Sequence, residues 1–212
     1  MSSLGRERRA FEKECLKALA AAAKDSGWKK SGPYLFRVRD EYFLCSTLSV
    51  HVNDHVSRGL LKAKPMGIDP ILWDILEMTG NNRQPLSLRA NGAFTCTALP
   101  ICEGTLEKKG DAPEQVAERF LRFCDTQAGL FMKETKRMPF TQYVERHPNQ
   151  VERGAYAITL VASLILDGDL DRARTVAGDY ATGRRNSVSS ISIEGKSFHE
   201  YALQWLAQRA KK

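Results

Sequence analysis

The spacing of apolar residues changes from every second residue to every third or fourth near residue 111, which limits the chain to a fold with a sheet-forming half and a helical half. Before this point, residues 34–52 alternate apolar and polar side chains, as half-buried strands do. After it, apolar residues follow helical spacing. We therefore predict an α+β protein. Residues 1–110 form an N-terminal helix plus an antiparallel β-sheet, and residues 111–212 form a helical region packed with them as one compact unit.

The first half is predicted to begin with a helix and a hairpin. Residues 3–25 carry apolar side chains three and four apart and an alanine run of high helix propensity. Residues 34–39 and 42–53 alternate in polarity on either side of Asp40-Glu41, which favours an antiparallel pair.

A short helix and a second hairpin are predicted before residue 111. After an extended segment at 60–65, Asp69 is predicted to cap a short helix with Pro70 at its first position. Residues 85–101 are predicted to form a second hairpin, because Asn91-Gly92 accepts the positive φ angles of a two-residue turn.

The second half is predicted to be helical to its end. The expected helices are 111–134, 140–146, 151–166, 170–181 and 196–210, and the polar stretch 183–195 between the last two is expected to be a mobile loop.

The stretch DGDLD at 167–171 poses a choice between a calcium loop and a helix corner. A calcium loop of the EF-hand kind needs Gly at its sixth position and Glu at its twelfth, where this chain has Arg172 and Gly178. A corner explains the same residues, since Gly168 suits a left-handed helix end and Asp169 suits an N-cap. We predict the corner.

Three sets of residues are candidates for a site. His51, Asp54 and His55 resemble a zinc motif in which His residues stand four apart, but that motif needs a helix and the preceding residues alternate as a strand. A basic, aromatic strand region also contains possible nucleic-acid contacts at Lys29, Lys30, Arg37 and Arg39, with Trp28 and Tyr34 as stacking partners. In the last helix, the stripe of Phe198, Tyr201 and Trp205 suits either a partner surface or the core.

The remaining signals disfavour several enzyme classes. The chain has no glycine-rich phosphate loop and no G-x-S-x-G elbow, so no cofactor is expected. Its five cysteines are widely spaced and are expected to be reduced and mostly buried. The charged N-terminus lacks the apolar run of a secretory signal, and we expect a cytoplasmic protein with no membrane segment.

The stretch GWKKSGPYLFRVRDEYFLCSTLSV at 27–50, after a leading helix, resembles the start of small bacterial α+β families of unknown function. Some proteins of this build are immunity proteins, which bind and block a toxin. The likeness covers about the first hundred residues. It implies a protein partner and assigns no functional residue.

The leading hypothesis is thus a non-enzymatic, cytosolic protein-binding module of the immunity type, with no catalytic residue and another protein, expected to be acidic, as its partner. The formal net charge of +7 supports the alternative of nucleic-acid or polyanion binding. A metal-dependent hydrolase using His51, Asp54 and His55 is the second alternative.

Overall fold

A computed structural model describes residues 3–51, 56–91, 94–106, 110–188 and 191–209, and its elements confirm the α+β class. The chain divides into two compact units that interleave in sequence. The sheet unit comprises Met1–Ala63 and Leu99–Glu134, and the helical unit comprises Lys64–Ala98 and Thr135–Lys212. The change of periodicity near residue 111 therefore marks the start of a helix within the sheet unit. The helical unit takes in the segment around Asp69.

The sheet unit contains a meander whose strands follow one another in sequence order. The strands are β1 (Lys29–Ser31), β2 (Tyr34–Arg39), β3 (Tyr42–His51), β4 (Val56–Pro65) and β5 (Leu99–Thr105). The predicted first hairpin is confirmed, since β2 and β3 pair antiparallel from Tyr34 opposite Thr47 to Arg39 opposite Tyr42. Its turn uses Asp40, whose φ of 50° is unusual for a residue other than Gly.

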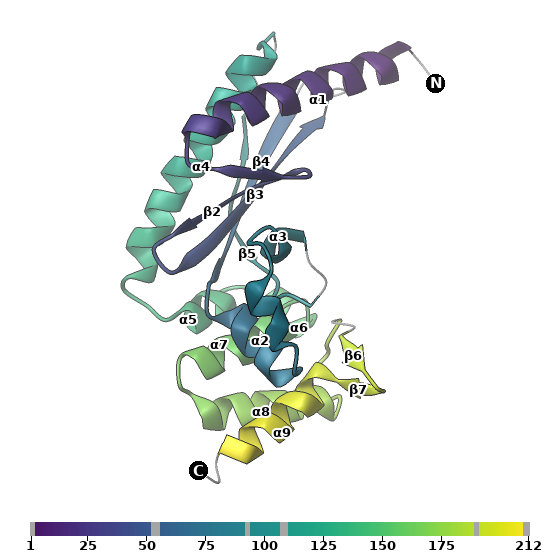
Figure 1. Ribbon diagram of the computed structural model, residues 1–212, viewed down its shortest axis with the longest axis vertical. Coiled ribbons are helices and arrows are strands. Elements are labelled where there is room, and N and C mark those ends of the chain that lie inside the picture. Colours follow the sequence, from purple (N-terminus) through teal and green to yellow (C-terminus); the bar gives the residue numbers. More distant parts are fainter. Residues whose placement is uncertain (1–2, 52–55, 92–93, 107–109, 189–190, 210–212) are drawn as a thin grey trace. The chain divides into compact units, whose positions relative to one another are not determined.

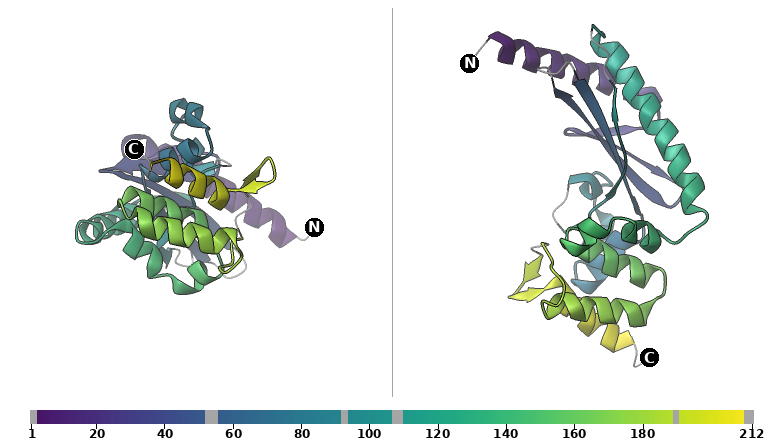
Figure 2. Two further views of the ribbon diagram at one scale, coloured as in Figure 1. Left: turned by 90° about the horizontal axis from the view of Figure 1, so that it is seen from below. Right: turned by 180° about the vertical axis from the view of Figure 1, so that it is seen from behind.

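Two helices pack with the sheet, α1 (Ser3–Ala22) and α4 (Pro113–Thr135) (Figures 1 and 2). The α4 helix runs along one sheet face, where Cys124 Sγ lies 3.1 Å from Ser46 Oγ and the Phe131 ring meets Tyr42 edge-on. The predicted apolar stripe of this helix is confirmed by burial of Val116, Ala117, Phe120, Leu121, Cys124, Ala128 and Phe131.

The prediction of a second hairpin at residues 85–101 is wrong. Leu88–Asn91 forms a short helix, α3, and the strand that follows, β5, pairs antiparallel with β4, with Leu61 opposite Cys102. The turn propensity of Asn91-Gly92 is a local preference worth little beside the burial that pairing within the sheet achieves. Gly92 itself lies outside the described residues.

The helical unit is organised around one central helix. It contains α2 (Ile68–Ile75), η3 (Thr79–Arg83), α3, α5 (Phe140–Glu145), α6 (Pro148–Glu152), α7 (Ala157–Leu166), α8 (Leu170–Ala181) and α9 (Phe198–Arg209). The residues of α7 are buried from Ala157 to Ile165, and this helix contacts α2, α5 and α8. A helix that is predominantly apolar on all its faces is stable only when neighbouring elements cover it on every side.

Three local predictions for this unit need correction. The helix predicted at 151–166 is broken, because α6 ends at Glu152 and Gly154 takes a φ of 74°. A side chain at Gly154 would also meet the backbone of Asn186, 2.0 Å from where its Cβ would lie. The stretch 183–195, expected to be a mobile loop, contains the strand β6 (Ser192–Ile193), which pairs antiparallel with β7 (Lys196–Ser197). The last helix, predicted from residue 196, therefore begins at Phe198.

The helix corner at DGDLD is confirmed. Gly168 has a φ of 79°, and the Asp169 side chain accepts a hydrogen bond from Arg172 N at the start of α8. No described helix is long and apolar enough to cross a bilayer.

Replacing Gly168 with alanine should lower the free energy of unfolding by about 1 kcal/mol, because the left-handed backbone penalises a Cβ while no atom crowds this position. Urea denaturation measures this loss, and Gly178→Ala inside α8 is the control, expected to be neutral or stabilising. A Gly168→Ala protein as stable as the wild type would show that the corner does not depend on the left-handed residue.

Candidate partner-binding site

The last helix, α9, is fixed at its start by a capping box. Ser197 N donates to Glu200 Oε2 at 2.7 Å, and Glu200 N donates back to Ser197 Oγ at 3.3 Å. The bond from the Ser197 backbone holds the pKa of Glu200 below its ordinary value. This cap sets where α9 begins and hence which face Tyr201 and Trp205 present.

A hollow of about 240 Å³ lies between the end of α2 and the outer face of α9. Its lining combines aromatic, acidic, basic and amide side chains: Asp74, Ile75, Glu77, Tyr201, Gln204, Trp205, Gln208 and Arg209. Two residues of the predicted stripe, Tyr201 and Trp205, thus lie together at a half-buried surface site within the helical unit.

The hollow has defined polar geometry. Trp205 Nε1 donates to Asp74 Oδ2 at 2.7 Å, and an Arg209 guanidinium nitrogen donates to the same oxygen at 2.9 Å. The Arg209 guanidinium carbon lies 3.5 Å from the centroid of the Trp205 ring. Tyr201 Oη donates to the carbonyl of Ile193 in β6. Contacts within the chain therefore hold both aromatic rings in place before any partner protein binds.

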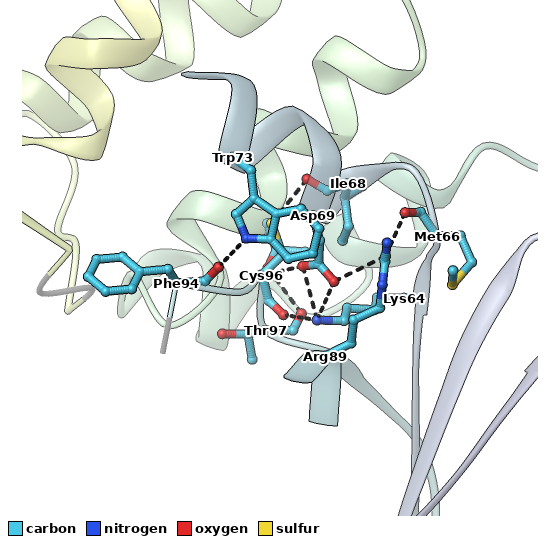
Figure 3. A network of polar contacts seen from close by, with 10 residues as sticks. Lys64, Met66, Ile68, Asp69, Trp73, Arg89, Phe94, Cys96 and Thr97 are labelled. Carbon is cyan, nitrogen blue, oxygen red and sulfur yellow. Dashed lines mark hydrogen bonds and ion pairs between the residues drawn. The ribbon is translucent and has the colours of Figure 1, made fainter. Parts of the chain in front are cut away.

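A buried ion pair holds the start of α2, the helix that borders the hollow (Figure 3). Lys64 Nζ lies 2.9 Å from Asp69 Oδ2, and the side chains of both residues are fully buried. Lys64 Nζ also donates to the carbonyl of Cys96 at 2.8 Å, and Cys96 N donates to Asp69 Oδ1 at 2.8 Å. Asp69 therefore attaches the first turn of α2 to the chain around Cys96.

The predicted role of Asp69 as a helix cap is wrong. The helix begins at Ile68, with Gly67 at the capping position and no side-chain cap. Asp69 lies inside the first turn and points into the core, because Lys64 and the Cys96 N–H offer its carboxylate stronger partners there than a helix end would.

Arg89 and Trp73 complete this network. Arg89 donates to the Met66 carbonyl at 2.7 Å and lies 3.3 Å from Asp69 Oδ2. Its guanidinium covers the Trp73 ring at 5.2 Å, and Trp73 Nε1 donates to the Phe94 carbonyl (Figure 3). These contacts orient α2 so that Asp69 points inward while Asp74, five residues later, faces the hollow.

Phe198, the third member of the predicted partner-binding stripe, does not belong to the surface. Its side chain is 1% exposed, and its ring packs against His199. The prediction is wrong for this residue because Phe198 occupies the first turn of α9 on the face that forms the core. The stripe divides into one core residue and two that line the hollow.

The four predicted nucleic-acid contacts do not all lie on one face of the sheet, because Lys29 points away from the side that Lys30, Arg37 and Arg39 share. Strand register places Lys29 opposite Phe36 and Lys30 opposite Leu35, so these two exposed lysines point to opposite sides of the sheet. Arg39 is exposed.

Arg37 and Trp28 are occupied within the sheet unit. Arg37 pairs with Asp125 at 3.1 Å and covers the Trp28 ring at 4.9 Å. Trp28 is 3% exposed and donates its Nε1–H to Asp125, so its ring is not available to stack on a base.

The candidate metal ligands lie outside what can be described, since Asp54, His55 and the side chain of His51 are not among the described positions. Within the described ranges, no group of three or more His, Cys, Asp and Glu residues could hold a metal ion.

None of the five cysteines, which all lie in the described ranges, is in a disulfide, and all but Cys102 are buried, which confirms the expectation of mostly buried residues. Burial raises the pKa of Cys124 to about 12 and raises the pKa of Cys96 as well. Thiols with raised pKa values are poor nucleophiles at neutral pH.

A scan against protein-family models, a search of curated proteins and a search of solved structures found no match to this chain. The site is therefore characterised by its geometry alone.

Sequence reasoning missed Asp74 and Arg209, the charged residues of the hollow, and the buried pair of Lys64 and Asp69. One signal pointed to the buried pair: Lys64 lies between Ala63 and Pro65 at the end of a strand, five residues before an aspartate. Nothing near Asp74 in sequence indicates that it meets residues more than 125 positions later.

Proposed function

We propose that this chain is a non-enzymatic protein-binding module that uses the hollow between α2 and α9. The observation that carries the proposal is the grouping of Trp205, Tyr201 and Arg209 around one concave surface. Trp, Tyr and Arg are the residues that contribute most to affinity at protein interfaces, especially where they line a pocket.

The rigidity of these side chains supports the same proposal. Trp205 is held by Asp74, and Tyr201 by the carbonyl of Ile193. Side chains that are already fixed lose little conformational entropy on binding, so more of their contact energy contributes to affinity.

A toxin is the specific partner that we propose, and this role rests on the likeness of residues 27–50 to families that include immunity proteins. If the partner is a toxin, adding equimolar purified chain should abolish its toxic activity. If saturating amounts of the chain leave the activity of its partner unchanged, the chain still binds a protein but does not act as an immunity protein.

The test of protein binding is capture from a lysate of the source cells by the tagged full chain after nuclease treatment. We expect one stoichiometric protein with the wild type, and Trp205→Ala should weaken its binding by about 30-fold or more, the effect of losing about 2 kcal/mol at an interface anchor. The matched control is Leu130→Ala in α4, because Leu130 is exposed and lies in the sheet unit.

Equal capture by the wild type and Trp205→Ala would place the interface elsewhere. Capture of nucleic acid alone, released by salt, would instead support the polyanion alternative. Circular dichroism of both variants checks that they fold.

A further inference from the structure

The hollow between α2 and α9 has a local charge opposite to that of the chain. Its lining contains two carboxylates, Asp74 and Glu77, and one guanidinium, Arg209, which leaves one net negative charge. The whole chain carries +7. Charge complementarity at this site therefore favours a cationic group on the partner.

The α2 helix adds to this preference. It ends at Ile75, and its last turn contributes Asp74 and Ile75 to the lining. A helix C-terminus carries a partial negative charge that stabilises cations within about one turn. This helix end acts in the same direction as the carboxylates.

Arg209 shows how a guanidinium fits here. It covers the Trp205 ring at 3.5 Å and donates to Asp74 Oδ2 at 2.9 Å. Both hydrogen bonds that reach Asp74 end on Oδ2, so within the described part of the chain Oδ1 is open to a further donor. The Asp74 side chain is 45% exposed and can be reached from solvent.

We propose that the hollow binds an arginine side chain of a protein partner, an inference that rests on the proposed protein-binding function. The incoming guanidinium donates to Asp74 Oδ1 and to the Glu77 carboxylate, and its planar face packs against the parts of the Trp205 and Tyr201 rings that Arg209 and Lys196 do not cover. A guanidinium suits this set of groups better than an ammonium, because it is planar and donates in pairs to carboxylates while it stacks on rings.

The experiment uses the full chain and three tripeptides, acetyl-Gly-X-Gly-amide, with X as arginine, lysine or citrulline. Citrulline matches arginine in shape without its charge. Binding is followed by NMR through the indole N–H signal of Trp205, assigned by its loss in Trp205→Phe. The indole signals of Trp28 and Trp73 are internal controls, because their N–H groups donate to Asp125 and the Phe94 carbonyl.

We expect the arginine peptide to shift the Trp205 signal with a dissociation constant on the order of millimolar, and the citrulline peptide to bind at least about tenfold more weakly. The affinity of the lysine peptide should lie between those of the arginine and citrulline peptides. Equal affinity for arginine and citrulline, or no shift of the Trp205 signal with arginine, would overturn the proposal.

Two variants sharpen the test. Asp74→Asn should weaken arginine binding about tenfold, whereas Arg209→Gln should strengthen it severalfold, because it removes the cation that already neutralises Asp74. A change that merely loosened the helical unit would weaken binding in both variants, so unaltered or weaker binding by Arg209→Gln would count against the proposal. Retained Trp28 and Trp73 signals show that each variant is folded.

The two proposals fail separately. If the arginine peptide does not bind but Trp205→Ala still loses the protein captured from lysate, the protein-binding function stands and the arginine is excluded. If the arginine peptide binds while capture is insensitive to Trp205→Ala, the cation site stands and the protein interface lies elsewhere.

Discussion

Asp69→Asn is expected to lower the free energy of unfolding by about 3–5 kcal/mol, the cost of leaving a buried charge without its counter-charge. Lys64 Nζ is fully buried and has the Asp69 carboxylate within 3.0 Å through both oxygens. Asparagine keeps an oxygen that accepts from Cys96 N, so the change removes mainly the negative charge. Urea denaturation followed by far-ultraviolet circular dichroism measures the loss.

The converse substitution, Lys64→Met, should lower the free energy of unfolding by less than Asp69→Asn does. Asp69 would still have Arg89 at 3.3 Å, and Arg89 is partly exposed, so the carboxylate would not be left without a cation. The double variant Lys64→Met/Asp69→Asn should lose clearly less stability than the sum of the single changes, because no unpaired charge remains. Strict additivity, or an Asp69→Asn protein within about 1 kcal/mol of the wild type, would contradict this account.

The features that sequence predicted correctly depend on neighbouring residues. The stripe of α4 follows from apolar residues three and four apart, and the corner before α8 follows from Gly168 and Asp169. The β2–β3 hairpin likewise joins segments separated by a two-residue turn. In each case the residues that determine the structure lie within a few positions of one another, so a short stretch of sequence is enough to predict it.

The features that sequence missed depend on distant residues. Residues 85–101 were predicted as a hairpin of their own, but β5 pairs with β4 about forty residues earlier, from Arg58 opposite Thr105. Asp69 was assigned to a helix cap because its partner Cys96 lies 27 residues away. The hollow joins Asp74 to Trp205, which are 131 residues apart. Local propensity cannot rank such contacts against the nearby alternatives.

His199 is expected to make the stability of the protein fall on acidification. Its side chain is 3% exposed, and its ring stacks on Tyr180 at 4.7 Å, with Nε2 lying 3.3 Å from Ser187 Oγ. Nδ1 is buried and has no hydrogen-bond partner among the described residues. Burial lowers the pKa of His199 to about 4. The Arg185 guanidinium, 5.9 Å from the Tyr180 ring, is paired with Asp179.

The direction of the pH dependence follows from proton binding in the two states. An unfolded histidine has a pKa of about 6.5, so between about pH 6.5 and pH 4 the unfolded chain binds a proton that the folded chain does not. The stability that neutral His199 contributes is therefore complete above about pH 6.5 and is lost as the pH falls towards 4. At about pH 5 the loss should approach 2 kcal/mol.

The measurement is urea denaturation of the wild type and His199→Gln from about pH 7.5 to pH 5. The difference in the free energy of unfolding between the two proteins should narrow or reverse at acidic pH. Glutamine does not titrate, whereas the imidazole, neutral when buried, takes up a proton when the wild type unfolds. Ser187→Ala is the matched control, because it removes the hydroxyl beside Nε2 but keeps the titrating group. Its free energy of unfolding should therefore change with pH as steeply as that of the wild type. Parallel pH profiles for the wild type and His199→Gln would show that the imidazole can take up its proton in the folded state, and hence that solvent reaches Nδ1.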